Sequence, residues 1–295
     1  MRRTLDPTEL ERRAAADAAD AAARAGVEIA PLDEVDELTA ASRLVADVWG
    51  TATDDSQLPP ELMRAMTHAG NYAAGAYAKG DLVGVVVGFL GRDDDGTYLH
   101  SHILGVSTAR RGGNIGFALK ADQRAWALAR GIDKITWTFD PLVRRNAHFN
   151  LQKLGAHAVE YLESFYGTMR DGINAGDESD RLLAVWYLSD AKATEAASGK
   201  LDEPAIADAA EVLSNGDGEP RLDGASGRSV LCATPDDIVA LRRSDPERAW
   251  RWRLALREAL GGAMHDGYSV SGFTRSGWYV LSRERKRWSE AASSR

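Results

Sequence analysis

The chain has 295 residues, of which 44% are hydrophobic and 27% are charged, as in ordinary soluble globular proteins. The single cysteine, Cys232, excludes an internal disulfide bond, and the net charge of −8 argues against nucleic acid as a partner. No apolar run approaches the roughly 20 residues that cross a bilayer, and the charged N-terminus lacks the apolar region of a signal peptide. We therefore expect a cytoplasmic protein without a membrane partner.

The N-terminal part of the chain is predicted to be mainly helical. Asp6-Pro7 is a good start signal for an alanine-rich helix that ends at Gly26. A short strand is predicted next, over residues 27–30. Apolar residues at helical spacing then predict a helix over residues 33–49, and Pro59-Pro60 opens a shorter helix through Met66.

From residue 71 the hydrophobic pattern becomes that of strands. Three strands are predicted over residues 71–78, 82–90 and 98–106, and polar turns over residues 79–81 and 93–96 separate them. The following pattern predicts, in chain order, a helix over residues 113–130, a strand over 132–139, a helix over 144–154, a strand over 156–161, a loop over 163–180 and a strand over 182–188.

The C-terminal part of the sequence is less regular. Residues 189–229 are rich in Ala, Gly, Asp and Ser, which is typical of a linker or an insertion, although residues 203–213 also fit a helix. A strand over residues 230–233, a helix over 235–264 and a hairpin over 268–281 are predicted after them. The predicted organisation is therefore a core with its N-terminal helix (1–190), a linker or insertion (191–228) and a strand-helix-hairpin subdomain (229–295).

The junction between the strand over residues 98–106 and the next helix carries the clearest chemical signal. Its sequence is Arg111-Gly112-Gly113-Asn114-Ile115-Gly116. A glycine-rich turn that leads into a helix directs free backbone N–H groups and the positive end of the helix dipole toward one point, where they can hold a phosphate group. A plain helix start with solvated arginines is the alternative.

This motif and the order of elements resemble the GCN5-related N-acetyltransferase (GNAT) superfamily over about residues 27–188. The family motif is Gln/Arg-x-x-Gly-x-Gly/Ala at a strand-to-helix junction, and here Asn114 replaces the middle glycine. Residues 135–156 look more closely like a little-characterised bacterial branch that has a C-terminal extension. The resemblance implies an α/β (α+β) fold, with a mixed, mostly antiparallel central sheet flanked by helices and a small C-terminal α/β segment.

The resemblance also implies acetyl-CoA, or another acyl-CoA, as co-substrate. It places the pantetheine arm where the strands over residues 98–106 and 132–139 separate, against backbone that includes Leu104 and Val106. It places the pyrophosphate on the N–H groups of residues 111–116. Arg144 stands where the family has an asparagine that contacts CoA, and Asn146 or Asn150 is expected to substitute for it.

Acyl transfer from a thioester to an amine needs a base that removes the ammonium proton. His100 and His102 lie two apart on one strand, so their side chains leave from the same face, and histidine titrates near neutral pH. The pair looks like the paired-histidine strand of arylalkylamine N-acetyltransferases, which implies that at least one of them is the base. Simple packing on the strand is the alternative. A zinc pair is a third interpretation, but no third ligand has convincing spacing, so no metal is expected.

The general acid is less evident from the sequence. Many family members have a tyrosine on the last core helix that faces the thiolate, but Leu151 occupies that position here. Tyr166 and Tyr161 are the candidates to replace it, and ordinary packing is the alternative for both. Asp140, at the end of a strand, is interpreted as a cap of the next helix, and orientation of the substrate is the alternative.

These observations predict an enzyme, an acyl-CoA-dependent N-acyltransferase that moves an acetyl or short acyl group to a small-molecule or protein amine by direct attack. The missing tyrosine keeps a second hypothesis open, a protein that binds or senses acyl-CoA without turnover. A metal-dependent hydrolase is the third. The arginines at positions 248, 251, 253 and 257 are interpreted as a solvated helix face. The C-terminal segment is expected to cover the acceptor site or to form a homodimer.

Overall fold

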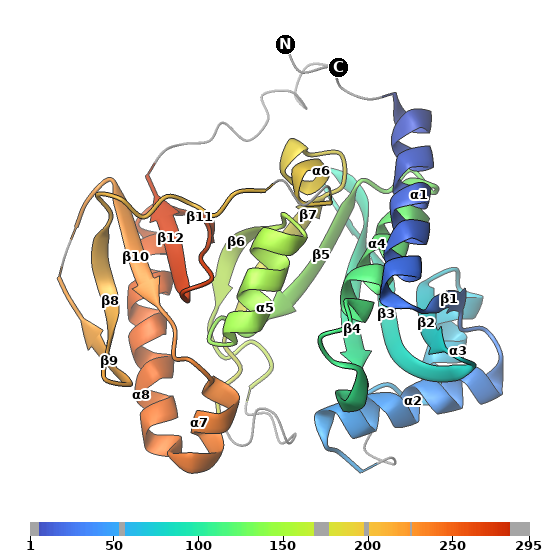
Figure 1. Ribbon diagram of the computed structural model, residues 1–295, viewed down its shortest axis with the longest axis horizontal. Coiled ribbons are helices and arrows are strands. Elements are labelled where there is room, and N and C mark those ends of the chain that lie inside the picture. The colour runs from blue at the N-terminus through green and yellow to red at the C-terminus, as the bar shows by residue number, and fades with distance from the viewer. Residues whose placement is uncertain (1–5, 53–56, 168–176, 198–200, 225, 284–295) are drawn as a thin grey trace. The chain divides into compact units, whose positions relative to one another are not determined.

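The computed structural model describes residues 6–52, 57–167, 177–197, 201–224 and 226–283 (Figure 1). The middle of the predicted loop over residues 163–180 lies outside these ranges. The chain divides into two compact units, with the divisions between Trp137 and Thr138 and between Ala184 and Val185. The described part of the first unit is residues 6–52, 57–137 and 185–197, and that of the second is residues 138–167, 177–184, 201–224 and 226–283.

The strands of the larger sheet follow the order β1-β2-β3-β4-β5-β7-β6 in the described part of the chain. Their bounds are β1 (Glu28–Pro31), β2 (Tyr72–Ala78), β3 (Asp81–Asp93), β4 (Gly96–Val106), β5 (Lys134–Phe139), β6 (His157–Leu162) and β7 (Arg181–Tyr187). Strands β1 to β4 pair antiparallel in sequence order, whereas β4 and β5 pair in parallel. The predicted three-strand meander is confirmed, because the turns at Gly80 and Gly96 place glycines at positive φ where the chain reverses.

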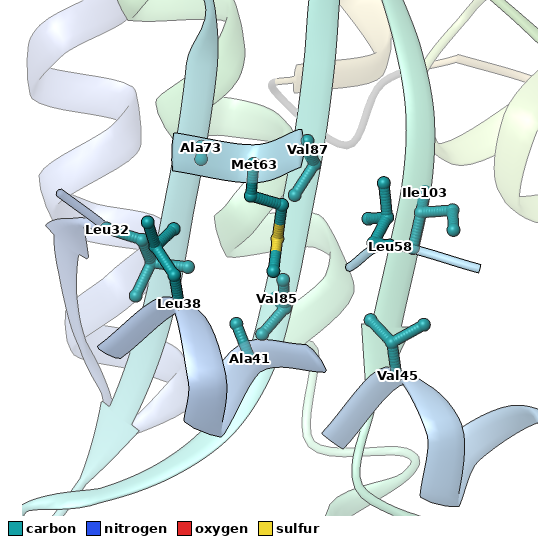
Figure 2. Close-up of a cluster of buried hydrophobic side chains, with 10 residues drawn as sticks. All are labelled: Leu32, Leu38, Ala41, Val45, Leu58, Met63, Ala73, Val85, Val87 and Ile103. Atoms are coloured by element: carbon teal, nitrogen blue, oxygen red, sulfur yellow. The ribbon is translucent and has the colours of Figure 1, made fainter. Parts of the chain in front are cut away.

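Helices cover both faces of strands β2 to β4 in the first unit. These helices are α1 (Pro7–Ala25), α2 (Val35–Trp49), α3 (Pro60–His68) and α4 (Ile115–Leu128). A carbon added at Gly84 of β3 would meet Ile115 and Leu119, so that side of β3 faces α4. The neighbouring residue Val85 faces the other way, because successive strand residues point to opposite faces. There it packs with Leu38 of α2 in a buried cluster (Figure 2).

That buried cluster consists of aliphatic side chains from α2, α3, β2, β3 and β4, together with Leu32 after β1 and Leu58 before α3. Its members are Leu32, Leu38, Ala41, Val45, Leu58, Met63, Ala73, Val85, Val87 and Ile103 (Figure 2). On the other face, α1 packs on α4 through Ala18, Ala21, Ala118 and Ala121, whose small side chains let two helices approach closely. Packing on both faces holds β3 and β4 in place. The ends of these two strands therefore have fixed positions and can carry a site.

The second unit contains a second sheet with the strand order β11-β12-β10-β8-β9. Its strands are β8 (Ala210–Gly216), β9 (Glu219–Leu222), β10 (Ser229–Ala233), β11 (Ser269–Phe273) and β12 (Trp278–Ser282). The remaining helical elements of the chain are η2 (Thr108–Arg110), α5 (Arg144–His148), η3 (Phe149–Lys153), α6 (Ala191–Ala197), α7 (Ile238–Ser244), α8 (Pro246–Leu256), η4 (Arg257–Gly261) and α9 (Gly262–His265).

The predicted fold class is confirmed: a mixed, mostly antiparallel sheet flanked by helices, with a smaller C-terminal α/β segment. Two details of the C-terminal prediction are wrong. Residues 210–213 form part of β8 rather than a helix. The predicted helix over residues 235–264 is broken at Asp245-Pro246, because proline cannot continue a helix and Asp245 caps the next one by accepting from the Arg248 N–H.

The predicted division into segments 1–190, 191–228 and 229–295 stays a prediction. Within residues 191–228 the structure has α6, β8 and β9. No helix in the described residues is both long enough and apolar enough to cross a membrane.

Candidate functional site

Strands β4 and β5 separate after a short region of parallel pairing. They pair only at Leu99 with Ile135 and at His100 with Thr136, although both strands are fully described. Strand β4 continues for six more residues, 101–106, and all of these except His102 pair with β3. The edge of β4 that faces away from β3 therefore presents backbone N–H and C=O groups that no described strand pairs. An extended ligand can bond to such an edge as an added strand would. Leu104 and Val106 lie in this stretch.

A β-bulge at His102 sets which side chains point to which face. Val87 of β3 pairs with Ile103, and Gly88 pairs with Ser101, so His102 is an extra residue in β4. Alternation places His100 and His102 on the face that carries α2, as predicted from their spacing. The extra residue then returns Ile103 to this same face, where it packs in the buried cluster of Figure 2.

The two histidine rings lie close together beside an exposed aromatic ring. The ring centroids of His100 and His102 are 6.4 Å apart, and the ring of Phe89 lies 5.0 Å from the first and 5.8 Å from the second. His100 Nδ1 is 3.0 Å from the Oγ1 of Thr136, which holds that ring at the last paired position of β4 and β5. His102 is the more exposed of the two.

The environment keeps both imidazoles neutral at neutral pH. Desolvation, together with the nearby charges of His102 and Lys120, lowers the pKa of His100 to about 4. Desolvation also lowers the pKa of His102. Because the neutral form of each ring predominates at pH 7, either ring can accept a proton there.

The glycine-rich turn between β4 and α4 has the geometry of an anion site. Gly112 has φ +88°, and a carbon added to it would meet nothing within 4 Å, so the space over the turn is open. Asn114 has φ +60°, the left-handed conformation that the family's glycine would adopt easily. The helix bonds begin with the Ala118 N–H and the Asn114 carbonyl, which leaves the N–H groups of Ile115 and Gly116 without partners inside the helix. Arg111 beside them is exposed.

Two of the predicted site residues belong to the second unit. Tyr166 is half exposed; its hydroxyl lies 3.2 Å from Thr138 Oγ1 and its ring packs edge-on against Phe165. Asn146 is on α5, where its N–H donates to the Val143 carbonyl. The structure therefore brings His100, His102 and the turn over residues 111–116 together in one unit, while Tyr166 and Asn146 are placed in the other.

The second unit contains a charged cluster that sequence reasoning missed. Asp140 accepts from Arg253 at 3.1 Å and from Arg242 at 2.6 Å, and Asp177 accepts from both arginines. Burial alone would raise the pKa of Asp140, but the charges of Arg253 and Arg242 hold it well below its usual range. The interpretation of Asp140 as a helix cap is wrong, because the cap position of α5 is Val143, and that of Arg253 as solvated is wrong, because it is 0% exposed.

Other candidates have structural roles in the second unit. The Tyr161 hydroxyl donates to Asp180 at 2.7 Å, which supports the packing interpretation of this tyrosine. Leu151 is buried and cannot donate a proton. Cys232 is buried, and this burial raises the pKa of its thiol to about 12. Among the described residues, no three His, Cys, Asp or Glu side chains lie close enough to hold a metal ion.

Sequence reasoning also missed a buried lysine, Lys120, at the point where β4 and β5 separate. The Nζ of Lys120 on α4 donates to Ser101 Oγ at 2.8 Å and to Gln123 Oε1 at 3.0 Å, and it lies 3.9 Å from the centre of the Trp137 ring. No local signal marks this burial, because in the sequence Lys120 looks like an ordinary lysine of the predicted helix.

Comparison with known families matches residues 35–156 to the acetyltransferase (GNAT) family. Comparison with curated proteins finds no significant match.

Similar solved structures match part of this chain at low sequence identity. An acetyltransferase of the GNAT family from Streptococcus pneumoniae is 16% identical, covers 54% of this chain and 98% of its own, and gives a TM-score of 0.45. The ribosomal-protein-S18-alanine N-acetyltransferase from Escherichia coli is 13% identical and covers 56% and 96%, with a TM-score of 0.44. A Salmonella typhimurium protein solved with acetyl-CoA is 15% identical and covers 55% and 94%, with a TM-score of 0.45.

Proposed function

We propose that this chain, whose residues 35–156 form an acetyltransferase domain of the GNAT family, transfers an acyl group from acyl-CoA to an amine. The observation that carries the proposal is the separation of β4 from β5 directly before a glycine-rich turn, with two neutral imidazoles beside it. A phosphate site, an unpaired strand edge and a base thus lie along one strand and its following turn.

The residues present fit the donor that the family uses. The N–H groups of Ile115 and Gly116 would hold the pyrophosphate, since the turn is open and the helix dipole favours negative charge. The exposed side chain of Arg111, beside the turn, would add a positive charge. The free edge of β4 around Leu104 and Val106 would bond the amides of the pantetheine arm. The acyl thioester would supply the electrophilic carbonyl carbon.

The histidine pair would supply the base. The acceptor nitrogen must lose its ammonium proton to attack the carbonyl carbon; the C–N bond then forms, and the C–S bond breaks to release the CoA thiolate. His102 is exposed on the α2 face and takes this proton directly or through one water. His100, whose Nδ1 lies 3.0 Å from Thr136 Oγ1, provides a second neutral acceptor. The thiolate is protonated by solvent.

The second candidate is a protein that binds acyl-CoA without turnover. Its specific support is Leu151, a buried residue where many family members have a tyrosine that faces the thiolate. This candidate predicts donor binding without release of CoA for any amine.

Release of CoA with a panel of amines tests the proposal. We expect turnover in the wild type, and His102→Ala should lower kcat/KM by roughly 10²-fold or more, the usual effect of losing a general base. His100→Ala should have a smaller effect. His68→Ala is the matched control, because His68 is an exposed histidine on α3 of the same unit and should leave the rate unchanged. Full activity in both His100→Ala and His102→Ala would overturn the base assignment, and tight donor binding with no turnover would favour the second candidate.

A further inference from the structure

Lys120 places a buried ammonium group at the point where β4 and β5 separate. Its Nζ bonds to Ser101 and lies over the ring of Trp137. Ser101 and Trp137 each come directly after the last paired positions of the two strands, His100 and Thr136. The Nζ therefore lies at the apex of the separation, on the α4 face, and the histidine pair lies on the opposite face.

The buried side chains of Lys120, Gln123 and Ser101 together have more hydrogen-bond donors than acceptors. An ammonium offers three N–H donors, the Gln123 amide offers two and the Ser101 hydroxyl offers one. Within the described part of the chain, the acceptors that bond to Lys120 are Ser101 Oγ and Gln123 Oε1. Gln123 is fully buried, and its Nε2 has no partner among the described residues. The orientation of this amide is fixed, because its oxygen must face the lysine.

Three other buried cations each have a carboxylate partner. Lys134 pairs with Asp93, Arg124 with Asp17, and Arg242 with Asp140. Lys120 has no such partner among the described residues, and its exposed fraction is only 3%. An unpaired buried charge and an unbonded buried amide each cost free energy, so their juxtaposition calls for an anionic acceptor.

We propose that Lys120 and Gln123 bind the carboxylate of an acidic acyl group carried by the donor, as in malonyl-, succinyl- or glutaryl-CoA. The inference rests on the proposed function and deepens it by naming the class of acyl group. One carboxylate oxygen accepts from Lys120 Nζ and the other from Gln123 Nε2, while the Trp137 ring packs on the methylene groups of the chain. The chemistry at the thioester is unchanged, because the carboxylate is remote from the carbonyl carbon that the amine attacks.

The pKa of Lys120 in the absence of a ligand agrees with this role. Burial without a counter-charge lowers the pKa of Lys120 to about 7. A bound carboxylate would favour the charged form and raise this pKa, as an opposite charge does in any weakly solvated site. A bound acidic acyl group would therefore supply an acceptor to the ammonium group of Lys120 and to the amide of Gln123.

A matched pair of donors tests the proposal. Succinyl-CoA and butyryl-CoA have acyl chains of the same length and differ in the terminal carboxylate. We expect the wild type to favour succinyl-CoA by roughly 10- to 100-fold in kcat/KM and in binding affinity, the range for charge-assisted hydrogen bonds. Lys120→Met, which keeps the shape and removes the charge, should abolish that preference and leave butyryl-CoA within a few-fold. Lys79→Met, at an exposed turn of the same unit, is the control and should keep the preference.

A second variant, Gln123→Glu, keeps the proposal testable if Lys120→Met does not fold. Its carboxylate would pair with Lys120 and repel a second one, so the preference for succinyl-CoA should be lost. No preference in the wild type, or an equal loss for both donors in Lys120→Met, would overturn the inference while the proposed acyl transfer stands. If neither donor nor acetyl-CoA binds, the proposed function itself fails and this inference fails with it.

Discussion

The two units bury positive charge in different ways. In the second unit, Arg242 and Arg253 meet Asp140 and Asp177, so each cation has a carboxylate partner. In the first unit, the described residues around Lys120 offer it two neutral oxygens and an aromatic ring, without a carboxylate. The charges of the cluster in the second unit balance one another, so it needs no outside charge, although Asp177 Oδ1, Arg242 Nη1 and Arg253 Nε have no hydrogen-bond partner in the described structure. We therefore expect it to act in the structure of the unit, whereas the unpaired charge of Lys120 can accept an anion from outside. The account predicts opposite consequences when each cation is removed.

The largest effect is expected in the balanced cluster. Arg253→Met leaves Asp140 and Asp177 buried with one cation fewer, and we expect the free energy of unfolding to fall by about 3–5 kcal/mol. Urea unfolding followed by circular dichroism measures this loss. Arg251→Met, on the exposed side of the same helix, should leave the transition nearly unchanged. An Arg253→Met protein as stable as the wild type would contradict the structural role of the cluster.

The next effect concerns the buried base His100. Its pKa in the folded chain is about 4, below the ordinary value of 6.5, so the unfolded state binds more protons between these values. The stability contribution is therefore present above pH 6.5 and is lost as the pH falls toward 4, by about 2–3 kcal/mol. Unfolding of His100→Asn should show a shallower pH dependence over that range, and His68→Asn should not. Equal slopes in His100→Asn and the wild type would contradict the burial of this imidazole.

Removal of the unpaired charge of Lys120 should raise the free energy of unfolding rather than lower it. Without ligand, Lys120→Met replaces an unpaired buried ammonium with an apolar chain, and we expect the free energy of unfolding to rise by about 1–2 kcal/mol at pH 6. Because the pKa of Lys120 in the folded chain lies below its ordinary 10.5, the wild type should gain stability as pH rises from about 7 toward 10.5, and the variant should not. A destabilised Lys120→Met protein would show that its bonds to Ser101 and Gln123 outweigh the desolvation cost.

The smallest effect is expected at Asn114. Glycine adopts the left-handed conformation at φ +60° without strain but loses more freedom on folding, so Asn114→Gly should change stability by less than about 1 kcal/mol. Affinity for CoA should stay within a few-fold, because the backbone N–H groups are unchanged. Calorimetric titration checks this, and a large loss of affinity would mean that the asparagine side chain itself holds the ligand.

Local sequence signals predicted the first unit better than the second. The strand meander, the glycine-rich turn and the helix after it depend on alternation and on turn residues close together in the chain. The bulge at His102 was not predictable, since it appears only when β4 is paired with β3. Its effect is large, because it places both histidines and Ile103 on one face.

Long-range partners explain the remaining differences. Arg253 looks like a member of a solvated arginine series until Asp140, which is 113 residues away, is brought to it. Lys120 looks like an ordinary helix lysine until Trp137 and Ser101 enclose it. In both cases the residue type is visible in the sequence, and whether its charge is balanced depends on tertiary contacts.

The central claim, that the first unit binds an acyl-CoA on the turn over residues 111–116, is tested most directly by thermal unfolding with and without acetyl-CoA. A ligand at about 100 times its dissociation constant stabilises the folded state by roughly 2.7 kcal/mol, a shift of several degrees for a chain of this size. We predict this shift for the wild type and for Ala129→Asp, at the other end of α4, but not for Gly116→Asp, whose carboxylate would repel the phosphates. No shift in the wild type with acetyl-CoA, succinyl-CoA or free CoA would contradict the account.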